Sequence, residues 1–153
     1  MARIEFFRNP LLARFLSWTG AFPVDRKAVP VGAMRHALRL LAEKKFVGIF
    51  PEGEILPAEA SVLAGGPLKR GVCMLARRSG CPIVPCVIRG SAKLASIRPW
   101  LPIRRGWIEI AFGPPMFAPV EGSRRTRDMH LASRLGQRLR DLDALLPLEL
   151  RRG

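Results

Sequence analysis

The chain has 153 residues, of which 48% are hydrophobic, so it suits a single domain with a buried core and is not a disordered chain. Its 26 Lys and Arg residues outnumber 12 Asp and Glu residues and give a net charge of +14. This charge favours anionic partners, namely phosphorylated small molecules, anionic lipid or nucleic acid, without choosing among them.

The three cysteines, Cys73, Cys81 and Cys86, are an odd number without a C-x-x-C spacing. This argues against a disulfide framework and against a zinc site. We expect all three to be buried and reduced, as in a cytoplasmic protein. No signal peptide is expected, because the first three residues lead into a charged segment. No uncharged apolar run approaches the roughly 18 residues of a spanning helix, so we expect the chain to lie on a membrane at most.

Residues 4–18 are predicted to form a short amphipathic helix that ends at Gly20. Apolar residues recur four apart in this segment, as Leu11 and Phe15 do, and Pro10 suits a first helical turn. The aromatic and basic side chains of the segment suit a bilayer interface. A helix that packs on a sheet explains the same pattern equally well, and both interpretations stay open.

A short strand over 20–26 and a helix over 31–45 follow. Pro23 makes the strand an edge or irregular one. The helix repeats apolar residues at helical spacing, and these residues are Met34, Ala37, Leu38 and Leu41. His36 falls on the polar side of this helix, so we expect no catalytic role for it, because a base needs a partner and a cleft.

Residues 46–54 carry the strongest local signal in the chain. An apolar run, Phe46 to Phe50, stops at Pro51-Glu52-Gly53, which predicts a buried strand that ends at a tight turn. Ligands of open α/β sheets bind at the carboxyl ends of strands, so Glu52 is a candidate site residue. The alternative is a strand end with a solvated glutamate.

A long irregular stretch over 51–67 precedes a helix over 68–79, and such loops inside a compact domain are usually functional or mobile. Basic residues are expected on the outer face of the helix, and these are Lys69, Arg70, Arg77 and Arg78. Gly80 is placed to end it. Residues 82–88 are predicted to form a second buried strand. We expect this strand and the strand over 46–50, joined by the helix, to form a right-handed parallel crossover.

The last third contains a second aromatic–basic cluster over 97–107, a strand over 106–112 and a long helix over 123–146. A leucine stripe is predicted to face the core from this helix, and its members are Leu135, Leu139, Leu142 and Leu146. His130 falls on the solvated face. The elements together predict an α/β fold with a mostly parallel sheet flanked by helices.

Four blocks in register carry a family resemblance, and they are Gly20 to Arg26, Phe50 to Gly53, Lys69 to Gly71 and Pro82 to Pro85. Across roughly residues 4–115 their order resembles that of the glycerolipid acyltransferase superfamily, nearest to the lysophosphatidic acid (1-acylglycerol-3-phosphate) acyltransferases. Each block alone is a weak signal, and the four together are a strong one.

The resemblance implies a single acyltransferase-like domain of phospholipid biosynthesis, peripheral on the inner face of a membrane. Such proteins transfer a fatty acyl group from acyl-CoA or acyl carrier protein to a hydroxyl of a lysophosphatidic-acid-like acceptor. It implies no metal and no cofactor beyond that acyl donor. Carried over by position, the implied substrate-binding residues are Arg26, Phe50, Pro51, Glu52, Gly53 and Lys69. An anionic membrane surface is the further implied partner, and nucleic acid is not expected.

Two departures from the family pattern matter. Ile55 stands where the family usually has a phosphate-binding Arg. The His-x4-Asp pair, whose His acts as general base in the family, is absent, because Leu41 follows His36 at that spacing and Leu135 follows His130. We therefore expect the chain alone to be inactive. Three explanations of the missing pair stay open: the chain is truncated at its N-terminus, its start is assigned at an internal Met, or it is a degenerate member of the family.

Two alternative functions remain. A basic nucleic-acid-binding module agrees with the charge of +14, but the sequence shows no helix-turn-helix, RNA-binding aromatic pattern or zinc spacing. A non-catalytic membrane-surface protein would keep the fold and lack the chemistry.

Overall fold

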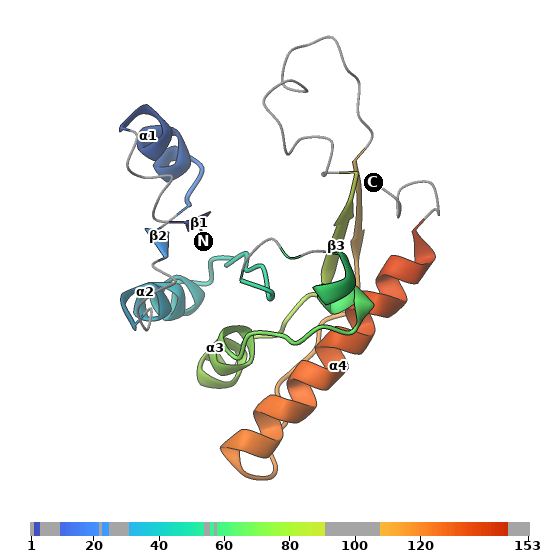
Figure 1. The fold of residues 1–153 in the computed structure, drawn as a ribbon. Coiled ribbons are helices and arrows are strands. Elements are labelled where there is room, and N and C mark those ends of the chain that lie inside the picture. The colour runs from blue at the N-terminus through green and yellow to red at the C-terminus, as the bar shows by residue number, and fades with distance from the viewer. Residues whose placement is uncertain are drawn as a thin grey trace.

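The structure is a computed structural model that describes residues 2–3, 10–21, 23–24, 31–53, 56, 58–90 and 108–146. Predictions made for residues 4–9, Arg26, Ile55 and 97–107 lie outside this part of the chain. The elements in chain order (Figure 1) are β1 (Ala2–Arg3), α1 (Pro10–Trp18), β2 (Pro23–Val24), α2 (Val31–Ala42), the short 3-10 helices η2 (Ala58–Ala60) and η3 (Val62–Ala64), α3 (Gly71–Ser79), β3 (Cys86–Arg89), β4 (Glu109–Phe112) and α4 (Arg124–Leu145).

Helices and strands alternate as an α/β chain, and the described strands form two small pairs. β1 and β2 pair in parallel over two residues each. β3 and β4 pair antiparallel, with Cys86 opposite Phe112 and Arg89 opposite Glu109. An isolated bridge between Ile83 and Met116 extends this second pair. The strands expected over 20–26, 82–88 and 106–112 are therefore present in shortened form.

The prediction of a strand over 46–50 is wrong. Residues 45–50 have no strand or helix assignment, Phe46 is fully exposed and Phe50 is 74% exposed. A strand is defined by its ladder partners, and none of the described strands pairs with this run. The parallel crossover expected between this run and residues 82–88 is absent from the described residues, where β3 pairs with β4 instead.

The core forms where α4 lies against α3, β3 and β4 (Figure 1). The predicted leucine stripe is confirmed, because Leu135, Leu139 and Leu142 of α4 and Leu146 directly after it are buried. Leu131 of α4 is a further buried leucine that was not predicted. These leucines pack in one cluster with Val62, Cys73, Ala76, Val87 and Met116. Residues from positions 62 to 146 thus share a single apolar core, whereas His130 is exposed as expected.

Two predicted helix ends are confirmed by left-handed glycines. Gly20 has a φ of 76° after α1, and Gly80 has a φ of 70° after α3 and donates its N–H to the carbonyl of Ala76 at 2.9 Å. Glycine populates this region without a Cβ penalty. α2 ends differently, because Lys44 itself adopts a φ of 58°.

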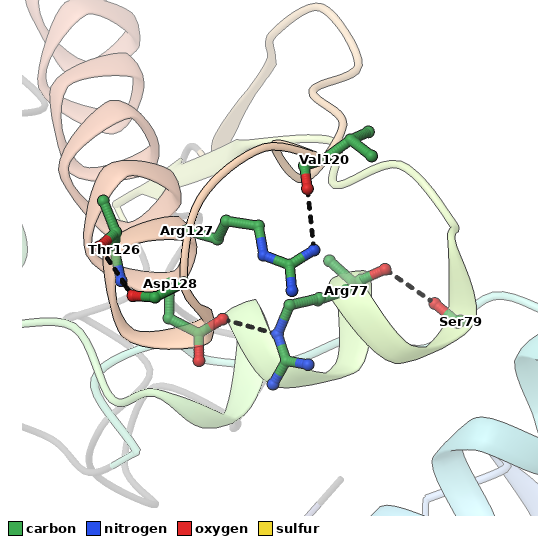
Figure 2. Close-up of polar contacts among 8 residues, drawn as sticks. Arg77, Ser79, Val120, Thr126, Arg127 and Asp128 are labelled. Carbon is green, nitrogen blue, oxygen red and sulfur yellow. Dashed lines mark hydrogen bonds and ion pairs between the residues drawn. The ribbon is translucent and has the colours of Figure 1, made fainter.

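Two ion pairs join α4 to distant elements. The Nε atom of Arg77 on α3 donates to Asp128 Oδ1 at 3.0 Å, as Figure 2 shows, and Arg89 at the end of β3 pairs with Asp143. The side chain of Arg77 is only 19% exposed. Its expected outward orientation is therefore wrong, because Asp128 holds it in the α3–α4 interface.

The three cysteines are free thiols, as expected. Cys73 is buried, whereas Cys81 and Cys86 are half-buried, so the expectation of full burial holds for one of them. Burial raises the pKa of the Cys73 thiol to about 11, and the negative charge of Asp128 acts in the same direction. Among the helices of the described residues, none is long and apolar enough to span a bilayer.

Candidate functional site

The Pro-Glu-Gly motif forms a hydrogen-bonded turn. The N–H of Gly53 donates to the carbonyl of Phe50 at 3.0 Å, and Gly53 has a φ of 75°. Pro51 takes the second position of the turn, where its fixed φ is favourable. The predicted tight turn is therefore confirmed, although it follows a segment that has no strand assignment and whose Phe46 and Phe50 are exposed.

Glu52 points from this turn to the start of η3. Its Oε1 atom accepts hydrogen bonds from the Ser61 hydroxyl at 2.6 Å and from the Val62 N–H at 2.7 Å. The N–H groups at the start of a helical turn lack partners within that turn, so the carboxylate satisfies one of them. Both bonds of Oε1 are thus made within the chain, and they tie the turn to η3.

Lys69 lies directly against the turn. Its backbone N–H donates to the Pro51 carbonyl at 2.9 Å, and a Cβ placed on Gly53 would lie 3.3 Å from the Lys69 Cγ. The aliphatic stem of Lys69 therefore covers Gly53 while the residue remains exposed. Two motifs that are 16 positions apart in the sequence meet here, at the start of α3.

The loop between these motifs is closed by Gly66. Its N–H donates to the Ser61 carbonyl at 2.8 Å. A Cβ at position 66 would lie 2.0 Å from the carbonyl oxygen of Ala60, so only glycine fits without a backbone shift. This close approach brings the chain back from η3 to Lys69.

The structure thus brings together five of the six predicted site residues, Phe50, Pro51, Glu52, Gly53 and Lys69. Phe50 is the first residue of the turn and is exposed. Arg26 lies outside the described residues, and so does position 55. No group of His, Cys, Asp and Glu side chains with metal-binding proximity occurs in the described ranges.

A hollow that the sequence did not predict lies between the end of α1 and α2. It has a volume of about 460 Å³, and its walls include His36, Lys45 and Phe46. Its described lining contains no carboxylate, so a His–Asp pair is not assembled there from the described residues. No spacing in the sequence connects α1 to His36, which explains why the hollow was not predicted.

A second and larger groove lies between the loop before α3, α3 itself and α4. Its volume is about 700 Å³. Arginines dominate its polar lining, and they are Arg70, Arg77, Arg124, Arg125 and Arg140. The sequence showed these residues only as separate basic positions on two helices, because their shared groove depends on how α4 packs.

Comparison with known proteins gives a family and one well-covered relative. Residues 1–89 match the family model described as Acyltransferase. Over 147 residues the chain is 30% identical to the 1-acyl-sn-glycerol-3-phosphate acyltransferase of Bacillus subtilis (strain 168), an alignment that covers 94% of this chain and 67% of that protein. No solved structure matches the chain.

Proposed function

The chain belongs to the acyltransferase family, and from this premise we propose that it is a protein of phospholipid biosynthesis, built for the transfer of a fatty acyl group to a lysophosphatidic-acid-like acceptor. Acyl-CoA or acyl carrier protein is the proposed donor. The relative named 1-acyl-sn-glycerol-3-phosphate acyltransferase supports this choice of acceptor. We also propose that the fold contains the mostly parallel sheet that the sequence predicts.

The contact between Lys69 and the Pro-Glu-Gly turn carries the proposal. The lysine stem is fixed over Gly53, and its backbone is tied to Pro51, so the ammonium group is held near the turn. An ammonium is a compact cation with three hydrogen-bond donors, which suits phosphate. The N-terminus of α3 begins two residues later and adds a favourable dipole for an anion.

We assign Lys69 to the acceptor phosphate, together with Arg26 by its position in the family block. Pro51, Glu52 and Gly53 form the platform, in which Glu52 keeps the loop over 58–66 in place. Phe50 offers an exposed apolar surface beside it for the lipid part of the acceptor.

The family's chemistry requires a base to take the proton from the acceptor hydroxyl as it attacks the thioester. This chain has no His-x4-Asp pair, and we propose that the chain by itself does not turn over. Purified protein given acyl-CoA and lysophosphatidic acid tests this directly. Turnover by the unaltered chain contradicts this proposal, and turnover that survives both His36→Ala and His130→Ala also contradicts the proposed dependence on a His base.

Binding of the acceptor is tested separately from turnover, by calorimetry with lysophosphatidic acid. Lys69→Met removes the charge but keeps an unbranched stem over Gly53. Because hydrogen bonds to charged groups contribute about 1.5–3 kcal/mol, we expect the dissociation constant to rise about 10- to 100-fold. Arg138→Met is the matched control, since it removes the same charge from an exposed position of α4. Equal losses in both variants mean bulk electrostatics and contradict the site.

A non-catalytic protein of the membrane surface is the second candidate function. One observation favours it: α1 exposes large apolar side chains, which are Leu11, Phe15 and Trp18. We propose that this helix lies in the interface of an anionic membrane, on its inner face. Both candidate functions share this membrane contact. An assay of acyl transfer by a chain that carries the family's His-x4-Asp pair distinguishes them, because only the acyltransferase function predicts turnover there.

A further inference from the structure

The arginine-lined groove between α3 and α4 is a separate feature from the Pro-Glu-Gly turn. Arg70 lies immediately before α3 and Arg77 within it, whereas Arg124, Arg125 and Arg140 belong to α4. Asp128 is the one acidic residue in the described lining, so five arginines and one aspartate give the groove a net charge of +4. Cations from both sides of the groove therefore face the same space.

Two of these arginines already have partners. Arg77 is bound to Asp128 at 3.0 Å, as Figure 2 shows. Arg140 donates to Gln137 Oε1 at 2.8 Å and to the Val62 carbonyl at 3.5 Å. These bonds fix the walls of the groove and leave less of their charge for a ligand.

The other three, Arg70, Arg124 and Arg125, have no side-chain hydrogen bond or ion pair with any described residue. All three are exposed. The first turn of α4 holds Arg124 and Arg125 and contains no acidic residue, although the positive end of a helix dipole disfavours cations there. The position of these charges therefore does not stabilise the fold by itself.

The lining of the groove is partly apolar. Leu68, Met129 and Ala132 belong to it, and so does Gly136, which adds no side chain. A Cβ at Gly136 would lie 3.7 Å from Leu68 Cδ1 and 3.4 Å from Arg140 Nη1. A volume of about 700 Å³ falls in the range of small-molecule sites.

We propose that this groove binds a small molecule that carries a diphosphate or a larger polyphosphate group next to an apolar or planar body. Guanidinium groups bind phosphate oxygens bidentately, and three of them on two sides of the groove match more than one phosphate group. The apolar part of the lining accommodates the rest of the molecule. The inference does not depend on the proposed acyltransferase function, since it is argued from the arginines and the apolar residues that line the groove.

The experiment is calorimetry on the full chain with ADP, pyrophosphate, coenzyme A and lysophosphatidic acid. We expect ADP and pyrophosphate to bind in the micromolar range. Coenzyme A contains a diphosphate group as ADP does. Tighter binding of coenzyme A than of ADP identifies a coenzyme as the source of the diphosphate, and tighter binding of ADP identifies a free nucleotide. Lysophosphatidic acid has a single phosphate, so binding to the groove that is tighter than that of ADP overturns the proposal.

The test variant is the double substitution Arg124→Gln/Arg125→Gln, and Arg134→Gln/Arg138→Gln is its control. Both variants remove two charges from exposed positions of α4, but only the first pair lines the groove. We expect the first variant to weaken ADP binding at least 30-fold and the control less than threefold. Equal losses in the two variants, or no binding of ADP and pyrophosphate to the unaltered chain at millimolar concentration, overturn the proposal.

Arg70→Gln supplies an independent test from the opposite side of the groove. We expect it to weaken ADP binding at least fivefold, since Arg70 precedes α3 and is not part of α4. Thermal unfolding without ligand should give a midpoint for Arg124→Gln/Arg125→Gln that is equal to or above that of the unaltered chain. A lowered midpoint means that the two arginines stabilise the fold, and it overturns the assignment.

Discussion

At the scale of single residues, Glu52 is the member of the turn whose bonds are most informative. Its Oε1 atom accepts from the Ser61 hydroxyl and from the Val62 N–H, and Val62 is a buried core residue. We predict that Glu52→Ala lowers the free energy of unfolding by about 1–3 kcal/mol, because it leaves a backbone donor without its acceptor in the interior. Urea denaturation measures this change.

Glu52→Gln and Glu59→Ala complete that comparison. The glutamine keeps an oxygen acceptor and should cost less than the alanine, whereas Glu59 is exposed and its loss should change stability by no more than about 0.5 kcal/mol. A Glu52→Ala chain with unaltered stability and no affinity for lysophosphatidic acid would instead place the carboxylate in the ligand site.

Cys73 makes a prediction about alkaline pH. Its folded pKa of about 11 lies above the ordinary value of 9.0, so the neutral thiol is favoured in the folded chain. The stability that this contributes is fully present below pH 9 and is lost as the pH rises from 9 through 11, because the unfolded thiol ionises first. We predict a fall in the urea midpoint over this window that Cys73→Ala reduces and Cys81→Ala does not.

At the scale of elements, α4 and Leu146, which directly follows it, supply five of the ten residues of the buried cluster. Leu135 is 2% exposed and lies in the middle of the stripe, whereas Leu145 on the same helix is 79% exposed. We predict that Leu135→Ala lowers the free energy of unfolding by about 2–5 kcal/mol, since it removes buried methyl groups and leaves a cavity. Leu145→Ala should stay within about 0.5 kcal/mol, and similar losses for both would contradict the observed packing of α4.

The helices were predictable from the sequence because their signals are local. The four-three-four spacing of the α4 leucines and the glycine after α3 each depend on neighbouring positions only. The strands were less predictable, because an apolar run such as 46–50 has strand composition whether or not a partner is present to form its ladder. The pairing of β3 with β4 joins positions that no local pattern relates.

The candidate site divides in the same way. The turn at Pro51 was predictable from its proline and glycine, whereas its contact with Lys69 was not, because the order of the family blocks gives no distance between them. The bonds of Glu52 to Ser61 and Val62 were not predictable, because a carboxylate that caps a turn nine or ten positions away has no fixed spacing. The arginine groove was missed because Arg77 and Arg124 meet only after α4 has packed.

At the scale of the whole molecule, the charge of +14 and the exposed apolar face of α1 act together. Trp18 is 82% exposed, and its ring lies 6.2 Å from that of Phe15. We predict that the protein co-sediments with anionic vesicles, because each basic residue near such a surface contributes about 1 kcal/mol. Raised salt should weaken the binding through screening, and Trp18→Ala should weaken it at every salt concentration.

Neutral vesicles and duplex DNA are the controls for that prediction. Equal binding to neutral and anionic vesicles contradicts the electrostatic contribution. Strong binding to duplex DNA with a steep salt dependence, together with no binding to either kind of vesicle, favours a nucleic-acid-binding function instead.

The ion pair between Arg89 and Asp143 has a consequence for how the protein is made. The two residues are 54 positions apart, and a ribosome adding roughly 5–20 residues per second needs about 3–11 seconds to cover that distance. During this interval Val87 and the other core residues already synthesised lack the α4 leucines against which they pack. The segment that matches the acyltransferase family is therefore synthesised well before the helix that encloses its core, and a truncated transcript ending near residue 89 should yield a product that chaperones and proteases remove.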